Sequence, residues 1–170
     1  MLWRVKLALV ILVAVVLQTT LLTHFDVFDA APGLCMLCVL AVAFEDGPES
    51  GALFGFAMGL ALDLFLITPL GLSALSFALT GYAVGAFQSS IVRTTPWLYP
   101  MIGGLGGLFG GFVFILVGGV VGQEGLLSRH GIQIVVVSAV WDAILAPLVF
   151  PVVRRVARLP EHSNTWRIRR

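Results

Sequence analysis

Two aspartates inside apolar stretches are the side chains of this sequence that could do chemistry. Asp63 follows Gly51, Gly55 and Gly59 in steps of four residues, so on a helix these four positions share roughly one face. A carboxylate among apolar residues is costly in lipid and is expected to face protein. We interpret Asp63 as a partner-binding or ion-linked group. The alternative is a helix-packing group that is protonated or bonded to a hydroxyl of a neighbouring helix.

Asp142 lies beside Trp141 near the middle of another apolar stretch, where a charge would cost even more. Two interpretations stay open. The carboxylate could pair with a hydroxyl or amide from the first or fourth predicted helix, or it could belong to a proton relay.

The other reactive residue types do not form a recognisable site. Cys35 and Cys38 have C-x-x-C spacing, but a redox pair belongs in a thioredoxin-like context and a zinc site needs two more ligands. We therefore interpret both as core residues. The three histidines fall in predicted loops or in the tail, and no phosphate-binding, hydrolase or metalloprotease motif occurs. The sequence predicts no catalytic, metal-binding or cofactor-binding residue and a protein that is not an enzyme.

Composition indicates an integral membrane protein. Of the 170 residues, 59% are hydrophobic and 11% charged, with a mean hydropathy of +1.03, whereas soluble domains have about 25% charged residues. The apolar blocks approach the roughly 20 residues that cross a hydrocarbon core. We predict an all-α protein with one six-helix membrane domain over residues 1–153 and a short basic tail over 154–170. Membrane lipid is an expected partner and nucleic acid is not.

Short polar stretches and turn signals separate the six predicted helices. The second helix is short and marginal as a span, and residues 45–50 after it are predicted to be a loop. Thr68 is predicted to cap the fourth helix, with Pro69 in its first turn. Gln18 is expected to bond backbone carbonyls or a neighbouring helix. The predicted helices are 5–22, 33–44 (the short one), 51–67, 69–90, 98–122 and 131–153.

The basic residues predict the orientation. With six spans, nine of the ten lysines and arginines lie on the side of the two termini, and only Arg129 lies on the other side. The positive-inside rule then places both termini in the cytoplasm of a multi-pass membrane protein.

Glycines four residues apart predict close helix packing, either inside the bundle or against the transmembrane helix of a partner. Small residues lie on several faces of the fifth predicted helix, more than one internal neighbour requires, which favours an external partner. The predicted partner-binding or helix-packing residues are Gly51, Gly55, Gly59, Asp63, Pro69, Gly71, Gly103, Gly107 and Gly111, and the predicted intramembrane polar residues are Asp63 and Asp142.

Three motifs carry a resemblance to a known family: LQTTLL at 17–22, EDGPESGALFGFAMGLALDL at 45–64 and PLGLSAL at 69–75. With them the chain resembles the MreD family of rod shape-determining membrane proteins of bacteria. The resemblance implies a non-enzymatic scaffold of the cell-wall elongation machinery in the cytoplasmic (inner) membrane, which maintains rod cell shape. It also implies binding to the single-span protein MreC, in a larger complex with MreB, the RodA glycosyltransferase and a class B penicillin-binding transpeptidase.

The family is similar, in turn, to the substrate-binding subunits of energy-coupling-factor vitamin transporters, which are six-helix bundles of about this size. This similarity implies an alternative function, a membrane subunit that binds a small molecule for uptake. Such a subunit should bring polar and aromatic residues together at an outward cavity. The predicted outer loops are short and offer mainly Asp26, Asp29, Glu124, Arg129 and His130. The sequence therefore favours the scaffold.

Overall fold

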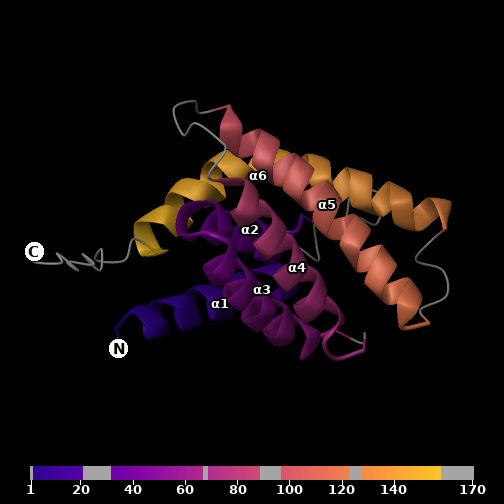
Figure 1. Ribbon diagram of the computed structural model, residues 1–170, viewed down its shortest axis with the longest axis horizontal. Helices are drawn as coiled ribbons and strands as arrows, with labels where there is room; N and C mark the ends of the chain where they lie inside the picture. The colour runs from indigo at the N-terminus through magenta and orange to yellow at the C-terminus, as the bar shows by residue number, and fades with distance from the viewer. Residues whose placement is uncertain (1, 21–31, 67–68, 89–96, 123–127, 158–170) are drawn as a thin grey trace, which may run out of the picture.

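The computed structural model (Figure 1) describes residues 2–20, 32–66, 69–88, 97–122 and 128–157, and these residues form six helices. The predicted all-α class and the predicted number of helices are confirmed. The helices are α1 (Leu2–Thr20), α2 (Leu34–Asp46), α3 (Pro48–Asp63), α4 (Leu72–Phe87), α5 (Leu98–Val120) and α6 (Arg129–Ala157).

Several predicted boundaries are wrong at the turns. Residues 45–50 are not a loop, because Gly47 alone, with a φ of 92°, connects α2 to α3. Pro48 then occupies the first turn of α3, where its missing N–H costs nothing. α4 begins at Leu72, so Pro69 precedes the helix, and Thr68 lies outside the described residues. α3 ends four residues earlier than predicted and α6 continues four residues further.

α2 is the central helix of the molecule. Its residues from Cys35 to Phe44 are buried without interruption, and α2 contacts all five other helices. A helix that is apolar on every face is expected to be enclosed by other elements. α2 has 13 residues and is about 20 Å long, which is short for a membrane span. This short helix forms the core that the other helices surround.

The other helices pack around α2 as two hairpins and a flanking helix. α3 and α4 form the most extensive contact between helices, and α5 and α6 form the next. Figure 1 shows α5 and α6 running side by side, with the first turns of α1 and the last turns of α6 at the same end of the molecule. The two hairpins determine which helix each row of glycines faces.

The outward faces of these helices are apolar. Every described helix except α2 has exposed large hydrophobic side chains, among them Leu12, Leu53, Leu79, Phe112 and Leu148. Soluble proteins rarely expose such continuous apolar surface, whereas a lipid environment suits it. Within the described residues, Leu98–Val120 and Arg129–Arg155 are both long and apolar enough to cross a membrane, and Ala8–Thr20 and Leu72–Phe87 are shorter apolar helices.

Candidate functional site

Asp63 is the last residue of α3, and its buried carboxylate (2% exposed) binds the beginning of α4. Its Oδ2 accepts hydrogen bonds from the backbone N–H groups of Gly71 (2.8 Å) and Ala74 (3.3 Å), and its Oδ1 accepts one from the N–H of Ser73 (3.2 Å). The first N–H groups of a helix have no partner within the helix, and a negative charge is favourable there. Asp63 therefore caps α4 from the neighbouring helix.

This is a helix-packing role, although the partner is not the expected hydroxyl. Among the described residues, the groups that Asp63 binds are backbone N–H groups. The interpretation of Asp63 as a partner-binding or ion-linked group stays a prediction. A signal was present in the spacing: a carboxylate at the end of one helix stands eight residues before a glycine that opens the next. Gly71 has a φ of 99° and lies directly before α4, so its left-handed backbone turns the chain into the helix.

Asp142 plays the same part for α2. It is 3% exposed on α6, and its Oδ1 accepts a hydrogen bond of 2.8 Å from the backbone N–H of Gly33, which directly precedes α2. The expected hydroxyl or amide from the first or fourth helix is therefore not the partner. Gly107 of α5 leaves room for the carboxylate, because a Cβ atom at Gly107 would lie 2.7 Å from Oδ2.

Gln18 provides α2 with a second cap. The Oε1 atom of this α1 residue accepts a hydrogen bond of 2.7 Å from the backbone N–H of Cys35. The prediction that Gln18 bonds a neighbouring helix is confirmed, although it accepts from an N–H group. Since a buried helix start has no water to satisfy its N–H groups, side chains of α1 and α6 together make the enclosed start of α2 possible.

The glycines of α3 face α4. A Cβ atom at Gly51 would lie 2.7 Å from the carbonyl oxygen of Gly81, and one at Gly59 would lie 2.5 Å from the Cα atom of Ala74. At Gly55 it would lie 2.7 Å from the carbonyl carbon of Phe77. The two backbones approach so closely that no side chain fits between them. Internal packing against α4 thus occupies this face.

The glycines of α5 serve two internal neighbours. Gly103, Gly107 and Gly111 face α6, where Cβ atoms would lie 2.6 Å from the Cβ of Ala146, 2.7 Å from Asp142 and 2.5 Å from Val135. Gly106 and Gly110 face α2, against Leu40 and Met36. The small residues that seemed surplus for one neighbour are therefore used by α2.

The side chains of the remaining predicted residues take no part in these caps. Pro69 is exposed in the turn before α4. Cys35 and Cys38 are buried in α2 as free thiols. His130 is exposed at the start of α6, and His24 and His162 lie outside the described residues. Within the described part of the chain, no group of three metal-binding side chains occurs.

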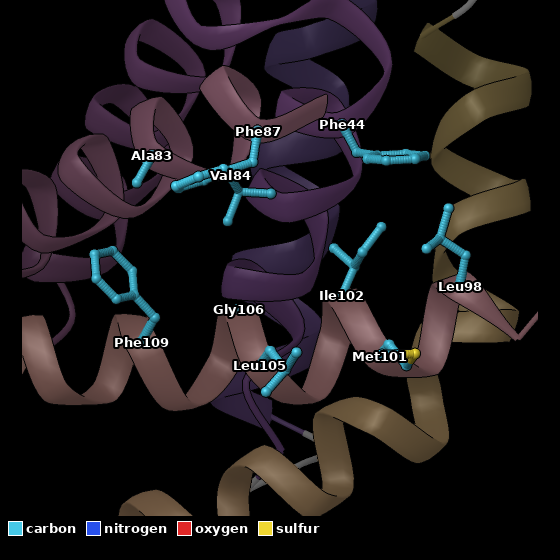
Figure 2. Close-up of a pocket in the computed structure, with 10 residues that line it drawn as sticks. All are labelled: Phe44, Ala83, Val84, Phe87, Leu98, Met101, Ile102, Leu105, Gly106 and Phe109. Atoms are coloured by element: carbon cyan, nitrogen blue, oxygen red, sulfur yellow. The ribbon is translucent and has the colours of Figure 1, made fainter. Parts of the chain in front are cut away.

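An apolar groove lies between α4 and α5, and we call it the α4/α5 groove (Figure 2). It has a volume of about 310 Å³. In Figure 2 the rings of Phe87 and Phe109 approach it from α4 and α5, and Phe44 of α2 reaches its end. The groove is lined by Phe44, Ala83, Val84, Phe87, Leu98, Met101, Ile102, Leu105, Gly106 and Phe109.

An aromatic cluster fixes one end of this groove. The rings of Phe44 and Phe150 lie 6.4 Å apart between centroids, and those of Tyr99 and Phe150 lie 5.2 Å apart. These contacts join α2, α5 and α6 beside the groove. Tilted aromatic pairs at such distances are favourable beyond the area they bury.

A second apolar groove, the α1/α6 groove, separates α1 from α6 on another side of α2. It has a volume of about 300 Å³. Its lining residues are Leu9, Val10, Val13, Ala14, Leu17, Leu34, Cys38, Leu148, Val149, Val152 and Val153. Next to it, Nε of Arg154 lies 3.7 Å from Oε2 of Glu45 on α2.

The comparisons with known proteins give one match. A family model described as rod shape-determining protein MreD matches residues 2–158, which is almost the whole chain. No curated protein and no solved structure matches the chain. The resemblance seen in the three sequence motifs is thereby confirmed, and it extends over all six helices.

Proposed function

Because the chain belongs to the MreD family of rod shape-determining proteins, we propose that it is a non-enzymatic membrane scaffold of the bacterial cell-wall elongation machinery. In this proposal it maintains rod shape by binding MreC and linking MreC to the peptidoglycan synthases, RodA and a class B penicillin-binding transpeptidase, and to MreB. The family match over residues 2–158 is the observation that carries the proposal. It assigns a role in rod shape determination, and the partners are our extension of it.

The proposed scaffold spans the cytoplasmic membrane six times with both termini in the cytoplasm. Two features support this topology. Nine of the ten basic residues fall on one side of a six-span arrangement. The beginning of α1 and the end of α6 also lie at the same end of the molecule, as an even number of crossings requires (Figure 1).

The α4/α5 groove is the proposed binding site for the transmembrane helix of MreC. The glycine faces of α3 and α5 are already used inside the chain, so they cannot receive a partner without unfolding it. The groove follows α5 from Leu98 to Phe109, about 16 Å along the helix axis. Its apolar and aromatic walls would be covered by an apolar helix, and a well-packed interface is what holds helices together in lipid.

Charge at the end of the groove favours a helix with a basic flank. Glu45 and Asp46 directly follow the lining residue Phe44, and Glu49 is exposed one turn further on. Arg93 is the single basic residue of the connection between α4 and α5. Since single-span proteins have basic residues at the cytoplasmic end of their helix, the exposed carboxylate of Glu49 would attract such a flank.

The alternative function, a small-molecule binding subunit of a vitamin-type transporter, has less support. Such a site should combine an apolar wall with a few convergent polar groups. Both grooves in the described part of the chain are lined by apolar side chains. The carboxylates of Asp63 and Asp142 are engaged by backbone N–H groups at the starts of helices.

Two variants in which phenylalanine replaces an alanine test the scaffold function and the proposed binding site for MreC together. Ala83→Phe fills the α4/α5 groove, whereas Ala57→Phe adds the same ring to an exposed position of α3 that lines neither groove. Overpacking an interface costs about 1–3 kcal/mol, or roughly tenfold or more in affinity. We expect Ala83→Phe to lose MreC from affinity-purified membranes and to fail to restore rod shape, and Ala57→Phe to behave as the wild type.

The outcomes separate the parts of the proposal. Equal capture of MreC by both variants would show that the α4/α5 groove is not the binding site. Wild-type protein that captures no MreC would overturn the scaffold, and co-purified ATPase subunits with a coupling protein would support the transporter subunit instead.

A further inference from the structure

The α1/α6 groove has a different chemistry at its end from the α4/α5 groove. Along α6 its wall is formed by Leu148 and Val152. Arg155 lies seven residues after Leu148 and three after Val152, so it is the next position on the same helix face. Along α1 its wall begins at Leu9, and Lys6 stands three residues before it. Each wall therefore continues into a basic residue one turn beyond the groove.

These two basic positions lie at the same end of the groove. Gln18 of α1 and Asp142 of α6 both bind the first N–H groups of α2, so these two residues lie at one level of the bundle. From that level, α1 leads back to Leu9 and α6 leads forward to Val152 in the same direction. Figure 1 agrees, because the beginning of α1 and the end of α6 lie together.

From this arrangement we infer that the α1/α6 groove is a binding site for an anionic phospholipid of the leaflet at the α6 C-terminal end, with an acyl chain between α1 and α6 and the phosphate at Arg155. The eleven lining residues are all apolar, and the groove follows α1 from Leu9 to Leu17, about 12 Å. That length and lining suit part of an acyl chain. The arginine at the end of the groove suits its phosphate.

Charge decides between a lipid and a partner helix at this groove. Transmembrane helices have basic residues at their cytoplasmic ends, and these would be placed against Arg155. An anionic headgroup is attracted to the same position. Arg155 is exposed, and among the described residues it has no ion-pair partner, whereas its neighbour Arg154 lies 3.7 Å from Glu45. Arg155 can therefore bind a ligand without giving up a contact within the chain.

The charge arm of the test compares two arginines. The full chain, purified in detergent, is titrated with phosphatidylglycerol and with phosphatidylcholine of identical acyl chains, and lipid retention is measured by native mass spectrometry. We expect phosphatidylglycerol to bind more tightly to the wild type. Arg155→Gln should weaken this binding about fivefold, the equivalent of roughly 1 kcal/mol for one basic residue near anionic lipid. Arg129→Gln, the same charge change at the other end of α6, should leave it unchanged.

The acyl-chain arm compares two valines of α6. Val152 is 54% exposed and lines the groove, and Val140 is 56% exposed and does not. We expect Val152→Trp to remove retention of phosphatidylglycerol and Val140→Trp to preserve it. Inorganic phosphate should not compete at concentrations equal to those of the lipid, because the acyl chain supplies much of the binding.

Three results would overturn the inference. One is equal retention of the two lipids by the wild type, and another is an equal effect of the two arginine variants. The third comes from a photo-crosslinker placed at Val152 in native membranes: an adduct with a polypeptide instead of a phospholipid would show that a protein occupies the groove. None of these readouts depends on whether the chain binds MreC.

Discussion

The backbone nitrogen of Gly71 lies 2.8 Å from Oδ2 of Asp63, so the residue that ends α3 holds the residue that opens α4. A turn between two helices is thereby closed by a carboxylate inside an apolar bundle. The same arrangement joins Asp142 to Gly33 across 109 positions of the chain. Intramembrane carboxylates are functional candidates by default, yet both of these stabilise the starts of helices.

Removing the Asp63 cap should destabilise the protein. Asp63→Ala leaves the N–H groups of Gly71, Ser73 and Ala74 without their acceptor, and loss of such a cap costs about 1–2 kcal/mol. The expected drop in melting temperature is on the order of 2–4 °C per kcal/mol for a chain of this size. Asp63→Asn keeps one acceptor oxygen, so its melting temperature should lie between those of the wild type and Asp63→Ala. Thermal unfolding in detergent measures this order, with the exposed Gln133→Ala as control. Wild-type stability of Asp63→Ala would contradict the capping role.

Asp142 offers the parallel test on α2. Asp142→Ala leaves the N–H of Gly33 unsatisfied next to the central helix, which should cost about 1–3 kcal/mol. Asp142→Asn retains an acceptor and should lose less. Gln133→Ala, an exposed polar substitution on the same helix, should leave the melting temperature unchanged. A proton-relay role would instead predict that Asp142→Asn and Asp142→Ala abolish function while both proteins remain fully stable.

Gln18 should hold α1 against the rest of the bundle. Gln18→Leu keeps the side-chain volume approximately but removes the acceptor for the N–H of Cys35, at a cost of about 1 kcal/mol or more. Gln18→Glu keeps an acceptor oxygen and should retain more stability. The comparison uses thermal unfolding and the abundance of inserted protein. If the leucine variant were the more stable of the two, the bond to Cys35 would not hold α1 in place.

Because α3 and α4 approach closely, the effect of a larger side chain on folding should depend strongly on its position along α3. At Gly55 even a Cβ atom would lie 2.7 Å from the carbonyl carbon of Phe77, so Gly55→Ala should destabilise and Gly55→Leu should reduce the amount of folded protein sharply. Ala57 is exposed, and Ala57→Leu should be tolerated. Size-exclusion profiles and yields in detergent distinguish the variants. Since the face is internal, Gly55→Leu should lose the fold and partner capture together. A folded Gly55→Leu protein that fails only in partner capture would place this face at an external interface.

Topology has a direct test. A reporter that is active only outside the membrane should be inactive after Arg170 and active at His130, as six spans with cytoplasmic termini require. The central, 13-residue α2 is the helix on which the count depends. Activity after Arg170 would mean that α2 does not cross the membrane and that the chain has five spans.

The sequence by itself determined the class of the protein and its helices. Apolar blocks of nearly membrane-spanning length are a local property of the chain, so they predicted six helices without any knowledge of how these pack. Glycines in steps of four predicted close approach of backbones for the same reason, because helical periodicity fixes which residues share a face. The motifs at 45–64 and 69–75 were sufficient to indicate the MreD family, which the match over residues 2–158 confirmed.

The tertiary structure alone decided what each of these faces and carboxylates contacts. The spacing of Gly51, Gly55 and Gly59 is compatible with any partner, and only the assembled bundle shows α4 against them. Asp63 and Asp142 bind backbone N–H groups, which every residue except proline possesses, so side-chain types do not identify their partners. The short spacing from Asp63 to Gly71 was a local signal, whereas Gly33 lies 109 positions from Asp142. The α1/α6 groove has walls from helices distant in sequence, and the α4/α5 groove adds Phe44 of α2 to two consecutive helices. Hydrogen bonds and cavities of this kind depend on the relative placement of whole helices, which local spacing does not encode.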